Sequence, residues 1–130
     1  MIELDVNDSA VTDIKEAQKD IERKLKELTG PPVVSTMRTA TLMILRDAKI
    51  FAPVDTGRLR ASITPSVSSS AEKVEGVVGS NVHYAPYQEM GTWPVKPSGQ
   101  GPRYLQRSYE KNISRIMEMF ERVIKKITES

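Results

Sequence analysis

The sequence predicts an α+β fold with two N-terminal helices, a small antiparallel β-hairpin or three-stranded sheet, and a long C-terminal helix. Apolar residues recur every three or four positions near both ends of the chain, which indicates amphipathic helices. A valine-rich segment in the middle has the composition of a strand. Because the chain has 130 residues and one plausible core, residues 1–130 are expected to form a single domain.

Proline and glycine mark the expected boundaries within this domain. Each boundary falls where a helical or strand pattern is interrupted. The expected parts are an N-terminal helix at 1–30, a central helix at 31–52, a turn and β-hairpin at 53–80, a tyrosine-rich corner with a Pro/Gly loop at 81–102, and a C-terminal helix at 103–130.

The first helix is predicted from a narrow apolar stripe, with lysine and glutamate on the remaining faces. Ala17 or Gln18 fills one gap in the stripe, and Gly30 is expected to close the helix. Pro31-Pro32 then stop this helix and start the next. The stripe consists of Val11, Ile14, Ile21, Leu25 and Leu28.

The second helix is expected from about Pro32 to Phe51, because Pro53 disfavours the helical conformation at Ala52. Its apolar surface is wide, and such a helix is typically covered on more than one side. We therefore expect it to be the central helix of the domain.

A turn followed by a strand is predicted after the central helix. The Asp55 carboxylate can accept a hydrogen bond from a backbone amide two residues on, and Gly57 can supply a positive φ. Beyond the turn, apolar and polar residues alternate, which predicts a half-buried strand with a basic outer face. The alternating residues are Arg58, Leu59, Arg60, Ala61, Ser62 and Ile63.

The predicted hairpin has a polar loop at 66–71 and a return strand at 72–80. Pro65 confines the first strand to an edge or ends its regular pairing. A short third strand at 92–95 is a further expectation. Two strands alone are marginal in water, so they are expected to lie against the central helix or to join a partner's sheet.

The tyrosine-rich corner reads as one helical turn. Tyr84 and Tyr87 are three residues apart, and Pro86 is tolerated only in the first turn. Gly91 is expected to cap this turn in the left-handed conformation. Glu89 is expected to form an ion pair with Arg58 or Arg60, which would fix the two corners relative to each other.

A Pro- and Gly-rich loop at 91–102 and a long helix complete the chain. Trp93, the only tryptophan, either packs on the core or awaits a partner. The last helix is expected to begin near Pro102 and to be about 35–40 Å long. It carries a heptad-like seam that must pack on another helix or another subunit. The seam consists of Leu105, Tyr109, Ile113, Ile116, Phe120, Val123 and Ile127.

The composition argues against catalysis and against a membrane protein. The chain has no cysteine and one histidine, His83, and no metal-ligand or nucleotide-binding spacing occurs, so no catalytic residue, metal or cofactor is expected. A hydrolase that uses His83 with Asp55 and a serine is a distant third reading. No signal peptide and no segment of about 20 apolar residues is found, which predicts a soluble intracellular protein.

A small nucleic-acid-binding module is the alternative reading. Four arginines could form a basic rim interleaved with aromatic residues, as on single-strand platforms. The net charge of +2 is too small to favour autonomous nucleic-acid binding. The same charge is compatible with a weaker role, in which the protein lines a ring through which DNA passes. The arginines are Arg58, Arg60, Arg103 and Arg107, and the aromatic residues are Tyr84, Tyr87, Trp93 and Tyr104.

Three motifs in order resemble the gene-product-ten-like family of HK-type lambdoid tailed phages. They are Ala-Pro-Val-Asp-Thr-Gly-Arg-Leu-Arg at 52–60, Tyr-Ala-Pro-Tyr-Gln-Glu-Met-Gly-Thr at 84–92, and Pro-Arg-Tyr-Leu at 102–105. The third motif departs from the family pattern, because Tyr104 replaces the usual phenylalanine and arginine and proline are in swapped order. The family comprises minor tail components and head–tail joining neck proteins of phages and prophages.

The resemblance implies a structural virion protein, not an enzyme. It would be made in the bacterial cytoplasm and act in the tail or neck, as a ring of copies of itself in contact with neighbouring neck or tail proteins. Contact with DNA would be non-specific at most, and no membrane is involved.

The resemblance also implies which residues matter for assembly. Arg58, Arg60, Glu89 and the loop at 91–102 are expected at subunit contacts. The full set of expected motif residues is Pro53, Asp55, Thr56, Gly57, Arg58, Arg60, Tyr84, Tyr87, Glu89, Gly91, Trp93, Arg103 and Tyr104.

Overall fold

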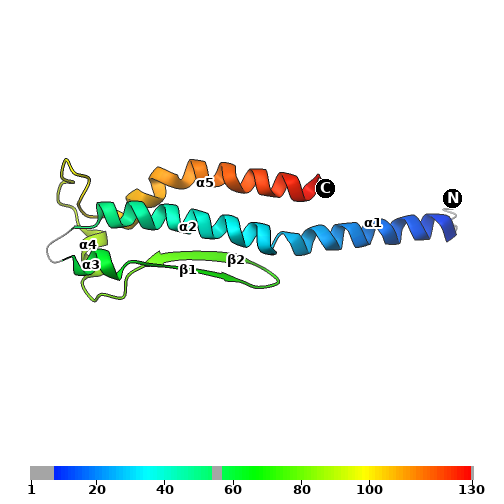
Figure 1. Cartoon of the computed structure of the whole chain (residues 1–130), viewed down its shortest axis with the longest axis horizontal. Coiled ribbons are helices and arrows are strands. Elements are labelled where there is room, and N and C mark those ends of the chain that lie inside the picture. The colour runs from blue at the N-terminus through cyan, green and yellow to red at the C-terminus, as the bar shows by residue number, and fades with distance from the viewer. Residues whose placement is uncertain (1–7, 54–56, 130) are drawn as a thin grey trace, which may run out of the picture.

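The computed structural model describes residues 8–53 and 57–129 and confirms the α+β class (Figure 1). Three long helices and one antiparallel hairpin make up most of it. In chain order the elements are α1 (Asp8–Glu27), α2 (Pro31–Phe51), α3 (Arg58–Ser62), β1 (Thr64–Ser69), β2 (Val74–Gly79), α4 (Ala85–Met90) and α5 (Tyr104–Thr128).

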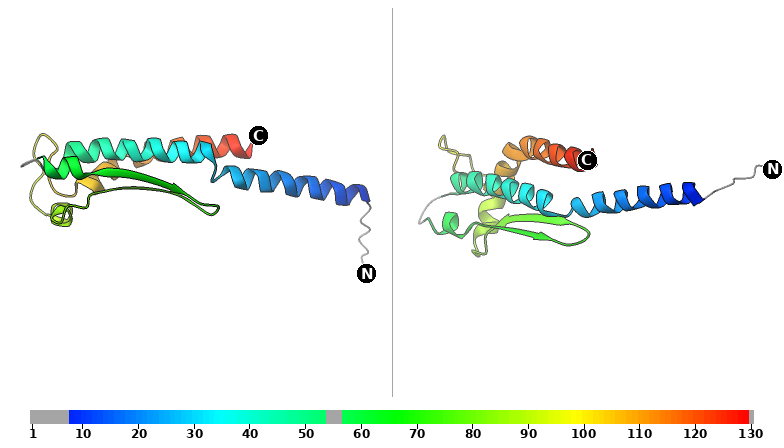
Figure 2. Two further views of the ribbon diagram at one scale, coloured as in Figure 1. Left: turned by 60° about the horizontal axis from the view of Figure 1, so that its bottom comes forward. Right: turned by 45° about the vertical axis from the view of Figure 1, so that its right-hand side comes forward.

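Helix α2 is the central element, as its composition predicts. Helix α5 packs along one side of α2 and the hairpin lies along another, while α1 projects beyond this body in nearly the same direction as α2 (Figures 1 and 2). The buried core lies where α2 ends and where α3, α4 and α5 converge. It is formed by Ala48, Ala52, Leu59, Ile63, Val82, Ala85 and Tyr104.

The junction between α1 and α2 is short. Gly30 has an extended conformation and its carbonyl accepts a bond from the Val34 amide, so the second helix starts at once with Pro31 in its first turn. Because Pro31 has no N–H to donate, the hydrogen bonding of α1 does not continue into α2.

The prediction of a strand starting at Leu59 is wrong, because residues 58–62 form the short helix α3. Gly57 precedes it with a φ of 78°, as the turn prediction allowed, and its carbonyl accepts from the Ala61 amide. Leu59 and Ile63 are buried while Ala61 is exposed. Positions 59 and 63 are four apart, a spacing that fits a helical turn as well as two strand periods.

The hairpin is longer than predicted at its loop end. Strand β1 runs to Ser69 and β2 begins at Val74, so the loop occupies 70–73 instead of 66–71, and the Ser70 amide donates to the Lys73 carbonyl at 2.8 Å. Pro65 lies within β1, opposite Val78. Proline is tolerated there because both strands of a two-stranded sheet are edges. The expected third strand at 92–95 is absent from the described residues, whose sheet has two strands.

The face of α5 that meets α2 is rotated from the predicted seam. Ile116 and Ile127 are buried as predicted, but Tyr109 is exposed. The remaining buried residues of the helix are Tyr104, Ser108 and Asn112. Two of these are small and polar, so an apolar pattern could not reveal them.

A buried carboxylate joins α2 to α5. Asp47 is only 1% exposed, and its two oxygens accept from Asn112 Nδ2 at 2.7 Å and from Lys111 Nζ at 3.2 Å. Burial opposes ionisation, but the bond from Asn112 and the nearby cations outweigh it and hold the pKa of Asp47 below its ordinary value.

Gly76 lets the hairpin approach α2 closely, which gives a first test. A Cβ at position 76 would overlap Thr41 Oγ1 and lie 2.9 Å from Met37 Sδ. We expect Gly76→Ala to lower the free energy of unfolding by about 1–3 kcal/mol, because the Thr41 and Met37 side chains, or the hairpin itself, must shift. Urea unfolding measures the loss.

Gly79→Ala is the matched control for this prediction. A Cβ there would meet no atom within 4 Å, so its effect should be close to zero. Equal effects of the two substitutions would contradict the close approach of β2 to α2.

Candidate assembly surface

The corner of the molecule is organised around Glu89 on α4. Its Oε2 accepts from the Leu105 amide and its Oε1 from the Gln106 amide, both at 2.9 Å. The first amides of a helix lack internal partners and carry partial positive charge, so a carboxylate is well suited to cap them. Glu89 thus binds the start of α5 to α4.

The prediction of an ion pair between Glu89 and Arg58 or Arg60 is wrong. Among residues 8–53 and 57–129, no ion pair joins Glu89 to either arginine. The backbone amides of α5 take the carboxylate instead. Arg58 is exposed, whereas Arg60 is half-buried, and its buried Nε has no hydrogen-bond partner among the described residues.

Arg107 holds the end of the 91–102 loop against α2. Its Nη1 donates to the Gly99 carbonyl at 2.7 Å and its Nε to the Pro102 carbonyl at 2.9 Å. The guanidinium also lies over the Phe51 ring, 4.8 Å from the centroid, in a cation–π contact. Because its donors bind the protein's own backbone, Arg107 is not available as a member of the basic rim considered above.

Tyr104 is a core residue and not a surface one. It is 1% exposed, and within the part of the chain that the structure describes its buried hydroxyl has no hydrogen-bond partner. Burial, and to a lesser degree the charge of Glu89, raise the pKa of Tyr104 to about 12. The preceding Arg103 is exposed and has a left-handed conformation with a φ of 55°. Its amide donates to the Gln88 carbonyl.

The remaining motif residues lie near the same end of the body. Pro53 is half-buried at the end of α2, while Asp55 and Thr56 lie outside the described residues. Tyr84 is half-buried and meets the exposed His83 ring edge-on, with centroids 5.4 Å apart.

Four apolar side chains of α4 and the following loop are exposed, and we call them together the corner patch: Tyr87, Met90, Trp93 and Val95. Tyr87 is 74% exposed, Met90 80% and Trp93 45%. The sequence predicted roles for Tyr87 and Trp93 but not for Met90 or Val95. A helical period that places Met90 outward was available, yet a lone methionine gives no signal of its own.

Gly91 supports the corner patch in a way that the sequence did not predict. Its φ is −63°, so the expected left-handed cap is wrong. Instead, the Trp93 ring occupies the space that a Cβ at position 91 would need. Glycine here lets the Trp93 ring pack closely and does not serve a special backbone conformation.

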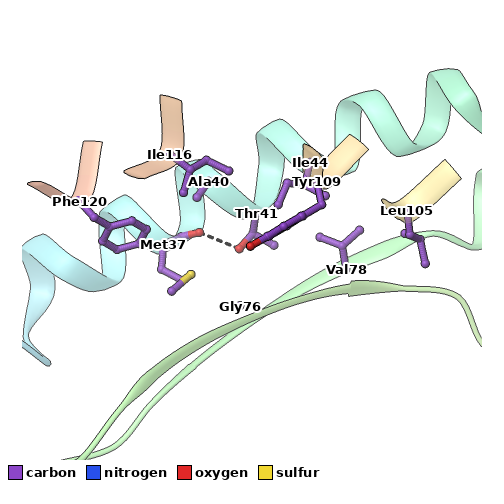
Figure 3. Close-up of a pocket in the computed structure, with 10 residues that line it drawn as sticks. All are labelled: Met37, Ala40, Thr41, Ile44, Gly76, Val78, Leu105, Tyr109, Ile116 and Phe120. Carbon is purple, nitrogen blue, oxygen red and sulfur yellow. Dashed lines mark hydrogen bonds between the residues drawn. The ribbon is translucent and has the colours of Figure 1, made fainter. Parts of the chain in front are cut away.

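An apolar groove of about 370 Å³ lies between α2, β2 and α5 (Figure 3). The Thr41 hydroxyl inside it is satisfied by the Met37 carbonyl at 2.7 Å, so the groove presents little unpaired polar surface. Part of the predicted α5 seam lines this groove. The lining residues are Met37, Ala40, Thr41, Ile44, Gly76, Val78, Leu105, Tyr109, Ile116 and Phe120.

The described residues offer little for metal or membrane binding. Within 8–53 and 57–129, no group of three His, Asp or Glu side chains is placed to hold a metal ion. Across the same residues, no helix combines the length and apolar character that crossing a bilayer requires.

Together these features define a small α+β protein in which Asp47, Glu89 and Arg107 bind other parts of its own chain. Residues 5–91, two thirds of the chain, match a protein family described as "Bacteriophage HK97-gp10, putative tail-component". The chain belongs to this family, which confirms the resemblance and supports a structural role in a phage tail, among other tail proteins of the virion. No curated protein and no solved structure matches it.

Removing the Glu89 carboxylate tests its role as the cap of α5. We expect Glu89→Ala to lower the free energy of unfolding by about 1–2 kcal/mol, because two amides lose their acceptor. Urea unfolding measures this loss. Glu110→Ala, on the exposed surface of α5, should change the free energy of unfolding by about 0.5 kcal/mol at most. A similar loss in both variants would count against the cap.

Tyr104 makes stability depend on alkaline pH. Its pKa is about 12 when folded and about 10 when unfolded, so the folded state holds the proton more tightly. The free energy of unfolding should therefore fall as the pH rises from about 10 to about 12. Tyr104→Phe, which also removes the unpaired hydroxyl, should be at least as stable at pH 7 and should fall less steeply. Identical pH profiles for the two proteins would rule this out.

Proposed function

We propose that this protein completes the head-proximal end of a phage tail or joins the tail to the head connector, acting in a ring of identical subunits. Family membership supports the tail role. The observation that carries the finer proposal is the corner patch, which displays large apolar side chains on a braced support. Aromatic residues and methionine are enriched where proteins bind one another.

The elements that carry the corner patch are held rigidly, which would make the patch suitable for assembly. The caps and clamps at Glu89 and Arg107 fix α4, the start of α5 and the loop end to the body. A contact surface that is already ordered costs less conformational entropy on binding. In this proposal Tyr87, Met90 and Trp93 touch a neighbouring subunit, Arg58 lies at the edge of the contact, and Glu89 acts from within.

The nucleic-acid reading becomes weaker in this arrangement. Arg107 donates to backbone carbonyls and Arg60 is half-buried. Arg58 and Arg103 are the exposed members of the proposed rim. Non-specific contact with passing DNA would therefore depend on these two positions.

Virion assembly provides the test of the corner patch. In a phage that lacks the natural gene product, the variant Tyr87→Ala/Met90→Ala/Trp93→Ala should leave filled heads and tails unjoined. Electron microscopy would count joined particles, which we expect to fall at least tenfold. All three side chains are exposed, so the fold should survive their removal.

The matched control removes exposed apolar side chains elsewhere, in Leu42→Ala/Val77→Ala. This variant should join normally. Because Trp93 is the only tryptophan, its emission should also shift to the blue when the wild-type protein assembles. Normal particle yields from the corner-patch variant would overturn the proposed contact.

A further inference from the structure

Helix α1 carries an apolar stripe that the rest of the described chain leaves largely uncovered. Residues 11–19 are all exposed, and further along Ile21 and Leu25 are each 58% exposed. The helix meets α5 only near its last turns, where Lys24 Nζ donates to the Thr128 carbonyl at 3.1 Å. Figure 1 shows α5 ending beside the last part of α1, while the rest of α1 extends beyond it.

The stripe follows a heptad repeat. Its steps of three, four, three, four and three residues match the a and d positions of a coiled coil. One a position is polar, and a single polar residue at such a site is a known determinant of register. The a and d residues are Val11, Ile14, Gln18, Ile21, Leu25 and Leu28.

We propose that α1 pairs with α1 of a second copy of this chain as an antiparallel coiled coil. The layers would place Ile14 of one copy against Leu25 of the other, and Gln18 against Ile21. Val11 and Leu28 would close the two ends. The contact has two-fold symmetry, so every interaction occurs twice.

The charges beside the stripe specify this pairing. Lys15 and Glu22 occupy successive e positions, and e positions of one helix face e positions of the other in an antiparallel pair. In the proposed register Lys15 of each copy lies opposite Glu22 of its partner. A slip of one heptad in one direction would place Lys15 against Lys15, and a slip in the other would place Glu22 against Glu22.

A parallel pair has no such complementarity. There, g positions face e positions of the next heptad, which places Ala10 beside Lys15 and Ala17 beside Glu22. Neither contact joins opposite charges. The charge pattern therefore favours a second copy of this chain, in antiparallel orientation, over a parallel arrangement.

Much of the exposed stripe, at Val11, Ile14 and Ile21, precedes the point at which Lys24 contacts the end of α5. Helices α2 and α5 run in opposite directions (Figure 1), so an antiparallel α1 from a second copy would have the direction of α5. This pairing uses no residue of the corner patch, so it and the proposed ring contact can fail separately.

Charge exchange tests the pairing on the full chain. Light scattering over a concentration series should detect a dimer of the wild-type protein. Lys15→Glu alone and Glu22→Lys alone should each weaken association about tenfold or more, because two attractive pairs become two repulsive ones. The double variant Lys15→Glu/Glu22→Lys should recover wild-type association. Glu16→Lys, a charge reversal at an exposed f position on the side of α1 away from the stripe, should have little effect.

Cross-linking distinguishes the orientation, because the natural chain has no cysteine. A mixture of Lys15→Cys and Glu22→Cys proteins should cross-link with a short bifunctional thiol reagent, whereas each protein alone should not. Any of three results would overturn the proposal: a wild-type monomer at all concentrations, no recovery in the double variant, or cross-linking of each single variant with itself. Loss of association in Ile21→Ser without sensitivity to charge would likewise mean that another surface covers the stripe.

Discussion

The buried carboxylate of Asp47 is the contact on which the position of α5 depends. A buried charge is tolerated only when it is paired, and here the hydrogen-bond donors come from one turn of α5, at Lys111 and Asn112, while Arg46 adds an ion pair at 3.7 Å. Sliding α5 by a turn would leave the carboxylate without these donors. One polar contact thereby fixes a register that the apolar contacts along the same helices would allow to vary.

The corner inherits its geometry from that register. With α5 fixed, its first amides come to Glu89, Tyr104 enters the core, and Arg107 reaches the loop end at Gly99. The side chains of α4 then divide between two tasks. Ala85 and Glu89 face the body, whereas Tyr87 and Met90 face outward as part of the corner patch. A short helix can do both because its successive residues point about 100° apart.

The sequence predicted the elements that have a long repeating pattern and missed contacts that have none. Helices α1, α2 and α5 and the hairpin were all predicted, because each repeats its pattern over several turns or residue pairs. Helix α3 was missed because five residues are too few to separate a period of two from a period of 3.6.

Contacts at the candidate site were harder to predict than its composition. Glu89 caps a helix 16 residues away through backbone amides, and backbone groups leave no trace in a sequence. Gly91 was assigned the role that glycine most often has at a helix end, but the neighbouring Trp93 ring decides its role. The aromatic residues of the site were found, since exposed tyrosine and tryptophan are conspicuous in a short loop-rich segment.

The junction at Gly30 allows α1 to turn as a rigid unit relative to the rest of the molecule. Since the α1 hydrogen bonds stop before Pro31, a change in the backbone angles of Gly30 swings α1 as one rod. Its 20 residues span about 30 Å, so a bend of about 10° would move the far end by roughly 5 Å. A small rotation at one glycine would thus change the reach of α1, and the contact of Lys24 with the end of α5 opposes it.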